Sequence, residues 1–181
     1  MAQLWLDLPA DKKMMVPGYQ PISEASIPQV PFKGAPTSQC TDPAVDTDAG
    51  YVRVIAGSFD GTKGPANTHS PVGLFHVVFK KDQATLVFTV EDGHNAVVFV
   101  KKGSVVVGGE KGSKVAESAV ALLNTAGTQL LLHTTEAGSE LLLLTGKPLN
   151  QPIAARGPFV MNTQQELQQA MFDFQSGNFG R

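Results

Sequence analysis

The sequence contains little net charge, one cysteine and no long apolar run, and each shortage excludes a class of protein. Its 14 basic and 16 acidic residues give a formal net charge of -2, so we expect no direct contact with nucleic acid or an anionic membrane surface. Cys40 has no second cysteine for an intrachain disulfide, which favours a loop thiol in a reducing compartment over a reactive thiol. The apolar runs are shorter than a membrane span and no signal-peptide pattern opens the chain, so we expect an intracellular protein, cytoplasmic, nuclear or both.

Motifs for catalysis and metal binding are also scarce. None of the histidines forms a His-x-His pair, so their spacing supports no metal site. The sequence has no Gly-x-Ser-x-Gly motif for a nucleophilic serine, and the glycine-rich residues 108–112 lack the ending of a phosphate loop. We therefore predict no catalytic residue in this chain. The histidines whose spacing supports no metal site are His69, His76, His94 and His133.

What the sequence has instead is a series of short strands. Proline recurs through residues 9–49 and excludes a long helix or a central strand there, so we predict an extended connector, with residues 35–48 as its most disordered part. From Tyr51 onward, short runs of Val, Leu and Phe alternate with Gly, Asp and Lys clusters, without helical segments between them. This pattern predicts an antiparallel sandwich or barrel. The expected strands are 51–56, 74–80, 84–90, 96–101, 104–108, 119–124, 129–134 and 140–145.

Two of these strands, 96–100 and 141–144, are apolar at every position rather than at every second one. One face of each must fill the interior. The other must meet the connector, the C-terminal segment or a partner domain.

One helix is predicted near the C-terminus, over about 163–176. Thr163 and Glu166 have the spacing of a capping box, and Gly177 can end the helix in a left-handed conformation. Gly157-Pro158 makes the approach rigid, and Phe159 and Met161 can anchor it to the barrel. A structural role is favoured, and a docking role stays open. Apolar residues at helical spacing follow the cap: Leu167, Ala170, Met171 and Phe174.

Two stretches resemble a known family. Residues 157–163, Gly-Pro-Phe-Val-Met-Asn-Thr, resemble the closing signature of the pirin family of cupins. Residues 3–9, followed by 11–17 and Tyr19-Gln20, resemble the hinge in the middle of a pirin. The resemblance implies an all-β, antiparallel cupin of the jelly-roll type, a β-barrel or sandwich with one short C-terminal helix. It implies three parts: a hinge strand and Pro-rich connector (1–49), a C-terminal-type cupin barrel (50–149) and a C-terminal segment (150–181).

The resemblance also implies where iron would be held. Pirins have two cupin domains, and the N-terminal one, which the resemblance implies is missing here, carries the Fe. Counting from Gly103 and from Gly127, the family's ligand positions fall on side chains that do not match it, and His133 is one residue out of register. We therefore expect no metal or other cofactor in this chain. The family's ligand positions fall on Thr89, Glu91, Asn95, Leu132 and Thr134.

Two classes of function follow from the resemblance. One is a metal-free cupin module for protein–protein interaction, of the transcription-cofactor or signalling type. The other is an iron-dependent activity like that of quercetin 2,3-dioxygenase, which would need the missing N-terminal barrel. We expect the first, with a protein partner, self-association or a separately supplied N-terminal half, because residues 4–8 form a strand without a neighbour. Two alternatives stay open: the chain binds a small molecule, or it is a fragment without an independent role. The candidate docking residues are Leu4, Trp5, Leu6, Phe159, Met161 and Phe174.

Overall fold

The computed structural model describes residues 3–34, 48–109 and 111–180. The chain divides into two compact units, which we describe separately: a larger unit, Ile22–Pro148, and a smaller unit, Met1–Pro21 with Leu149–Arg181. Cys40 and the segment expected to be disordered, apart from Asp48, lie outside the described residues. No helix in the described part of the chain is long and apolar enough to cross a membrane.

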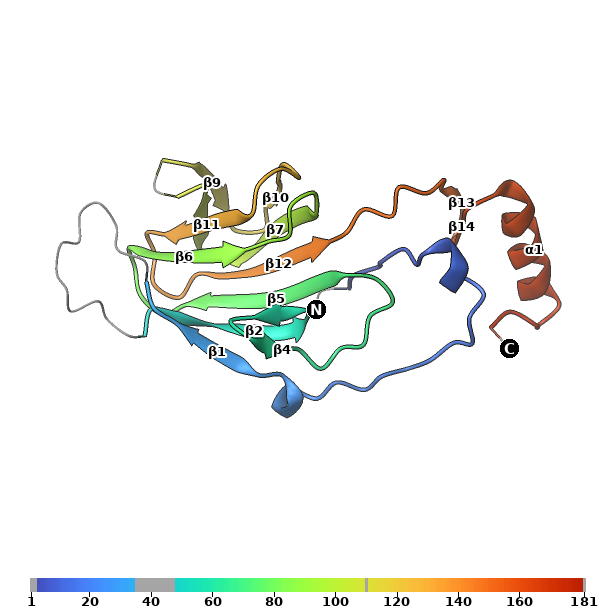
Figure 1. Cartoon of the computed structure of the whole chain (residues 1–181), viewed down its shortest axis with the longest axis horizontal. Helices are drawn as coiled ribbons and strands as arrows, with labels where there is room; N and C mark the ends of the chain where they lie inside the picture. Colours follow the sequence, from blue (N-terminus) through green and yellow to red (C-terminus); the bar gives the residue numbers. More distant parts are fainter. Residues whose placement is uncertain (1–2, 35–47, 110, 181) are drawn as a thin grey trace. The chain divides into compact units, whose positions relative to one another are not determined.

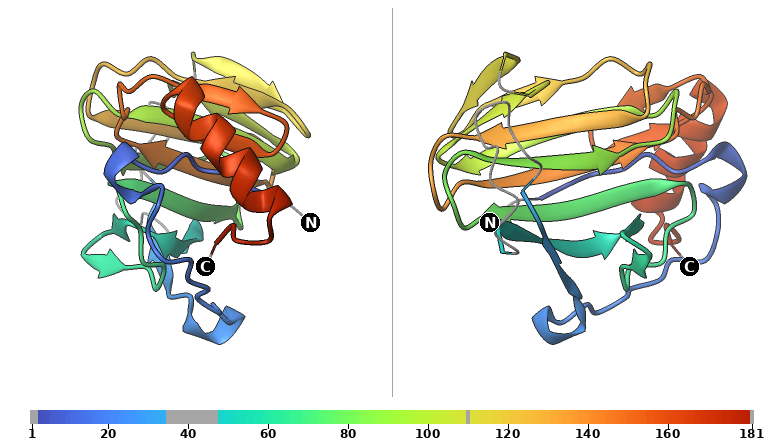
Figure 2. Two further views of the ribbon diagram at one scale, coloured as in Figure 1. Left: turned by 90° about the vertical axis from the view of Figure 1, so that its right-hand side faces the viewer. Right: turned by 60° about the vertical axis from the view of Figure 1, so that its left-hand side comes forward.

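The larger unit is a sandwich of two antiparallel sheets (Figures 1 and 2). A hairpin of β3 (Ser58–Phe59) and β4 (Thr62–Lys63) and a short 3-10 helix at Glu24–Ser26 complete it. The first sheet has the order β1 (Gln29–Phe32), β2 (Gly50–Ala56), β5 (Val72–Phe79), β12 (Glu140–Gly146), β7 (Asn95–Lys102), β10 (Val120–Leu122). The second has the order β6 (Ala84–Thr89), β11 (Gln129–Thr134), β8 (Ser104–Val107), β9 (Ser113–Ala116). The predicted all-β, antiparallel sandwich is confirmed.

The core lies between the two sheets and is filled by alternate residues of the strands, because successive side chains of a strand point to opposite faces. In β12, Leu141 and Leu143 are fully buried in the core. Leu142 and Leu144 lie half-buried on the outer face of the six-stranded sheet. The central strands are therefore apolar on both faces, as the sequence predicted.

Each of the eight strands predicted from Tyr51 onward is present, with its ends displaced by a few residues at most. β1 lies in the Pro-rich connector, and it is an edge strand, which is where a strand can accommodate Pro31 without losing a ladder hydrogen bond. The short strands β3, β4 and β9 were not expected. The strand predicted over residues 4–8 is wrong: no strand is present between Gln3 and Pro9, and a single-turn 3-10 helix follows at Ala10–Lys12.

The smaller unit contains a hairpin and one helix (Figure 2). Strands β13 (Ala154–Arg156) and β14 (Phe159–Met161) pair around a turn at Gly157-Pro158, and helix α1 (Gln164–Gln175) follows at once. The predicted capping box is present: the Glu166 N–H donates to Thr163 Oγ1 at 3.1 Å, and the Thr163 N–H donates to Glu166 Oε2 at 2.8 Å. A small apolar core joins the helix to the hairpin, made of Ala154, Met161, Leu167 and Ala170.

Candidate functional surfaces

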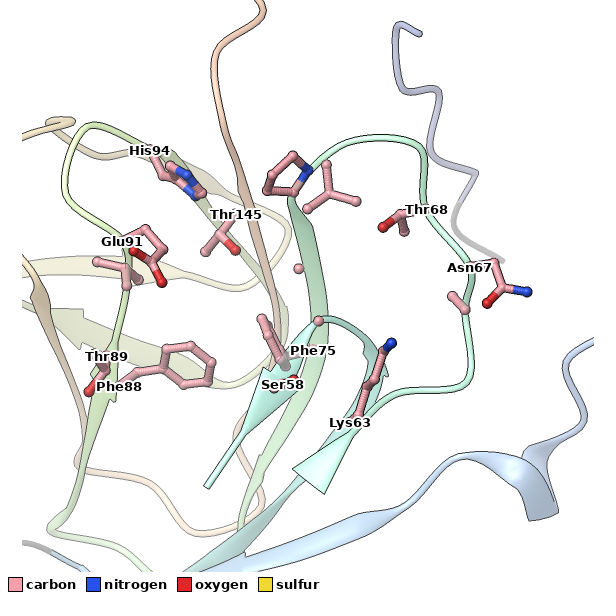
Figure 3. Close-up of a pocket in the computed structure, with 16 residues that line it drawn as sticks. Ser58, Lys63, Asn67, Thr68, Phe75, Phe88, Thr89, Glu91, His94 and Thr145 are labelled. Atoms are coloured by element: carbon pink, nitrogen blue, oxygen red, sulfur yellow. The ribbon is translucent and has the colours of Figure 1, made fainter. Parts of the chain in front are cut away.

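A cavity of about 460 Å³ opens at one end of the sandwich (Figure 3). Its floor contains the rings of Phe75 and Phe88, whose centroids lie 4.7 Å apart in an edge-to-face arrangement. Glu91 and His94 lie on one wall and Lys63 on another, so the rim presents a carboxylate, an imidazole and an ammonium group. Apolar floors with a few polar groups are typical of small-molecule pockets. The cavity can therefore hold a small polar molecule.

The ligand positions implied by the pirin resemblance do not converge on this cavity. Thr89 and Glu91 line it, and Asn95 begins β7 just beyond. Leu132 lies in the apolar core, and Thr134 Oγ1 lies 3.0 Å from the Ser139 hydroxyl.

The strand register separates these positions further. Gln129 faces Thr89, whereas Thr134 faces Ala84, so Thr134 and Thr89 are separated by roughly 17 Å along the strands. In the described part of the chain, no three His, Cys, Asp or Glu side chains are placed to hold a metal ion. An iron centre does not fit these residues.

The buried histidine has a structural partner. His133 is only 3% exposed, and its Nδ1 lies 2.9 Å from the hydroxyl of Thr85 on the neighbouring strand. It sits on the opposite face of β11 from the core residue Leu132, as strand alternation predicts. This histidine is therefore accounted for by packing and one hydrogen bond.

A second histidine belongs to a charged network on the six-stranded sheet. His76 Nε2 lies 3.2 Å from Glu140 Oε2, which also accepts a hydrogen bond of 2.7 Å from Lys101 Nζ. Burial lowers the pKa of His76, even though the hydrogen bond with Glu140 opposes the shift. The hydrogen bond from Lys101 lowers the pKa of Glu140 most, and His76 adds to the effect. The three side chains thus form one network, in which Lys101 compensates the charge of the Glu140 carboxylate.

The smaller unit contains an apolar groove of about 510 Å³, formed by the N-terminal segment, the hairpin and α1. Five of the six predicted docking residues line it, while Leu4 is exposed but lies outside the lining. We call this surface the apolar groove. The five are Trp5, Leu6, Phe159, Met161 and Phe174.

The aromatic residues of the groove are arranged as a cluster that remains open to solvent. The rings of Phe159, Phe174 and Phe179 contact one another edge-to-face, with centroids 5.5 to 6.3 Å apart. Trp5 is 70% exposed and Phe174 is 62% exposed. Phe179 was missed by the sequence reasoning because a single aromatic residue in a glycine-rich tail has no periodic neighbours. The groove offers a preformed apolar surface that no described residue of its own unit covers.

Two antiparallel sheets enclosing an apolar core, with a cavity at one end, place the larger unit among the cupins. Residues 77–180, more than half of the chain, match the family model described as the pirin C-terminal cupin domain. The chain belongs to the pirin family. The crystal structure of quercetin 2,3-dioxygenase from Acinetobacter baumannii has the same fold, with a TM-score of 0.81 and 34% sequence identity, over 97% of this chain and 55% of that one.

Curated relatives agree with this assignment. A Pseudomonas aeruginosa protein with a provisional quercetin 2,3-dioxygenase name is 39% identical over the whole chain, which covers 57% of that protein. The pirin-like protein of Caulobacter vibrioides is 34% identical over 98% of this chain and 58% of its own length. Rat pirin is 30% identical over 98% of this chain and 56% of its own length. The chain thus spans a little over half of the length of these relatives.

Proposed function

We propose that this chain acts as a pirin-type protein-interaction module and that the apolar groove of the smaller unit is its docking surface. The observation that carries this proposal is the exposure of Trp5 and Phe174 in a preformed groove. Contiguous exposed apolar surface usually marks an interaction site in a soluble protein, and large aromatic residues dominate the energetics of such sites. The activity would be that of a transcription cofactor or signalling partner rather than that of an enzyme.

The exposed areas of these two side chains are large enough to act as hot spots. Aromatic side chains bury about 150–250 Å² each, so covering some two thirds of Trp5 or Phe174 removes on the order of 100–170 Å² from water. At about 25 cal/mol per Å² this corresponds to ~2.5–4 kcal/mol for each residue, before the cost of ordering the two surfaces.

The partner we propose is a second cupin domain of the pirin type. The matched family model is that of a C-terminal cupin domain, and the relatives continue for more than 40% of their length beyond the part that this chain matches. Within a family, the domain that accompanies the matched one in the same polypeptide is the natural occupant of an apolar surface. The remainder of the Pseudomonas aeruginosa relative supplies this domain in testable form.

The experiment is a calorimetric titration of that remainder, expressed on its own, into the present chain. Phe174→Ala should weaken binding at least tenfold, because it removes a central ring of the groove. Phe172→Ala is the matched control: Phe172 is 64% exposed on the same helix but does not line the groove. Two residues along an α-helix lie about 200° apart around its axis, so the two rings point in different directions.

Absence of binding by the wild-type chain would refute the proposed partner. An equal loss in the Phe172→Ala and Phe174→Ala variants would refute the groove as the binding surface. Both variants retain the capping box and the small apolar core, so circular dichroism should show the same helix content in each.

A second candidate function is an iron-dependent quercetin 2,3-dioxygenase-like activity, favoured by the names of the Acinetobacter and Pseudomonas proteins. Its iron ligands would have to come from another domain, because the positions identified in this chain include Leu132 in the apolar core. Quercetin consumption measured with Fe(II) should be absent for this chain alone and should appear only when the complementary domain is added. Turnover by the chain alone would reverse our preference between the two functions.

A further inference from the structure

The six-stranded sheet ends at β10, whose outer edge is open. Among the described residues β10 pairs with β7 and with no other strand. Val120 is 56% exposed and Leu122 is 80% exposed, and both lie on the outer face of the sheet, opposite Phe99 and Val97. An apolar edge strand of this kind is a template for another strand.

The backbone of β10 shows which groups are available for pairing. The Val100 N–H donates to the Ala119 carbonyl at 3.1 Å, and the Leu123 N–H donates to the Ala96 carbonyl at 3.0 Å. In an antiparallel ladder the residues of one strand direct their amide groups alternately to the two sides. Since the backbone groups of Ala119 and Leu123 point toward β7, those of Ala121 do too. The N–H and C=O groups of Val120 and Leu122 therefore point away from the sheet.

The other sheet edges carry features that discourage pairing. β1 contains Pro31, which has no N–H to donate, and β9 contains Lys114. β6 has the β3–β4 hairpin beside it, where the ring of Phe59 stacks on that of Phe88 at 5.1 Å. Residues 118–125 around β10 contain no charged side chain, so two such edges can approach each other without like-charge repulsion.

We propose that two copies of this chain associate through antiparallel pairing of their β10 strands, with the two-fold axis at Ala121. In that register Val120 lies opposite Leu122 of the second copy, and each such pair exchanges two backbone hydrogen bonds. The exposed Val120 and Leu122 side chains then meet across the axis as apolar cross-strand pairs. The strands are short, so the interface falls in the small, transient class below about 1,200 Å². This edge belongs to the larger unit, and the proposal does not depend on the apolar groove.

Disulfide trapping tests the register directly, in a Cys40→Ser background. Ala121 would face its own copy at a non-hydrogen-bonded position, where Cα atoms lie about 4.5 Å apart, within the range that a disulfide spans. Ala121→Cys should therefore give a covalent dimer on mild oxidation. Val120→Cys is the matched control: it would lie two residues out of register with its own copy, roughly 8 Å away by strand geometry, and should cross-link at least tenfold more slowly.

Two further variants separate this edge from the groove. Adding Leu122→Lys to Ala121→Cys should abolish cross-linking, because it places like charges at the pairing edge, whereas adding Phe174→Ala should leave cross-linking unchanged. Equal cross-linking of the Ala121→Cys and Val120→Cys variants would overturn the proposal, as would an Ala121→Cys protein that folds normally and stays monomeric. If Ala121→Cys fails to fold, sedimentation velocity of the wild-type chain at millimolar concentration decides: a dimer removed by Leu122→Lys supports the proposal, and a strictly monomeric wild type refutes it.

Discussion

Replacing Thr163 with alanine should destabilise helix α1 and, with it, one wall of the apolar groove. The substitution removes the hydroxyl that accepts the Glu166 N–H at 3.1 Å, while the Glu166 carboxylate keeps its bonds from the N–H groups of Thr163 and Asn162. Loss of such a cap costs about 1 kcal/mol, within a range of about 0.5–2 kcal/mol. The helix buries only Leu167 and Ala170, so the cap is a substantial part of what fixes its start.

Trp5 provides the assay because it is the only tryptophan and it lines the groove. Thermal unfolding followed by its fluorescence should show a midpoint lowered by about 2–4 °C, the shift expected when a protein of this size loses 1 kcal/mol. Thr163→Ser is the control, because it keeps the hydroxyl and should unfold near the wild-type midpoint. A Thr163→Ala protein with an unchanged midpoint would refute the role assigned to the cap.

The same cap has a pH dependence of known sign. Hydrogen bonding to the Thr163 side chain is the main cause that lowers the pKa of Glu166, and the amides of Thr163 and Asn162 add to it. A carboxylate with a lowered pKa stabilises the fold above its ordinary pKa, and that contribution is lost as pH falls through its folded-state value. The wild-type midpoint should therefore fall toward that of Thr163→Ala below about pH 4.5, the ordinary pKa of the group. Parallel pH profiles for the two proteins would contradict this reasoning.

Three further predictions concern the larger unit. Gly103 has φ +73°, and an added Cβ would lie 2.6 Å from Ser139 Oγ. Gly103→Ala should therefore lower the free energy of unfolding, measured by urea titration, by at least about 2 kcal/mol. A smaller loss would show that the turn can relax. Burial lowers the pKa of His76, so below about pH 6.5 protons bind this histidine in the unfolded state before they bind it in the folded state, and the wild-type protein loses stability. His76→Gln should remove this loss. If the variant loses stability over the same pH range as the wild type, another group is responsible. Leu143→Ala, at a fully buried position, should cost about 2–5 kcal/mol by chemical denaturation, and a loss below 1 kcal/mol would mean that it is not a core residue.

The sheet was predictable from the sequence because its central strands are rich in Val, Leu and Phe and end at turn residues. The double-sided apolar pattern of residues 141–144 indicated correctly that one face of β12 fills the core; the other face is half-buried, and its contact with the connector, the C-terminal segment or a partner domain stays a prediction. β9 and the β3–β4 hairpin are short and polar, so local composition could not distinguish them from loops. Each pairs with the strand next to it along the chain, β3 with β4 and β9 with β8.

Residues 4–8 show why composition and family resemblance can fail together. The segment is apolar at every position but Asp7, but a strand needs a neighbour for its N–H and C=O groups. No described strand pairs with this segment, and it has no regular secondary structure. The expected exposure of Leu4 and Trp5 is nevertheless present, at 47% and 70%.

The candidate sites were predictable to different degrees. Five residues of the apolar groove could be named from a family signature and an apolar segment, whereas Phe179 could not. The cavity of the larger unit could not be predicted from the sequence, because Lys63, Glu91 and Thr145 lie on separate elements that meet only when the sandwich folds.

Trp5 fluorescence provides the sharpest test of whether the apolar groove binds a second cupin domain. The complementary domain of the Pseudomonas aeruginosa relative, made free of tryptophan, is titrated into the present chain. We expect a saturable blue shift, because covering a side chain that is 70% exposed removes its indole from water. The Phe174→Ala variant should require at least tenfold more of the domain for the same shift. An emission spectrum that stays unchanged at a large excess of the domain would show that the groove does not bind it.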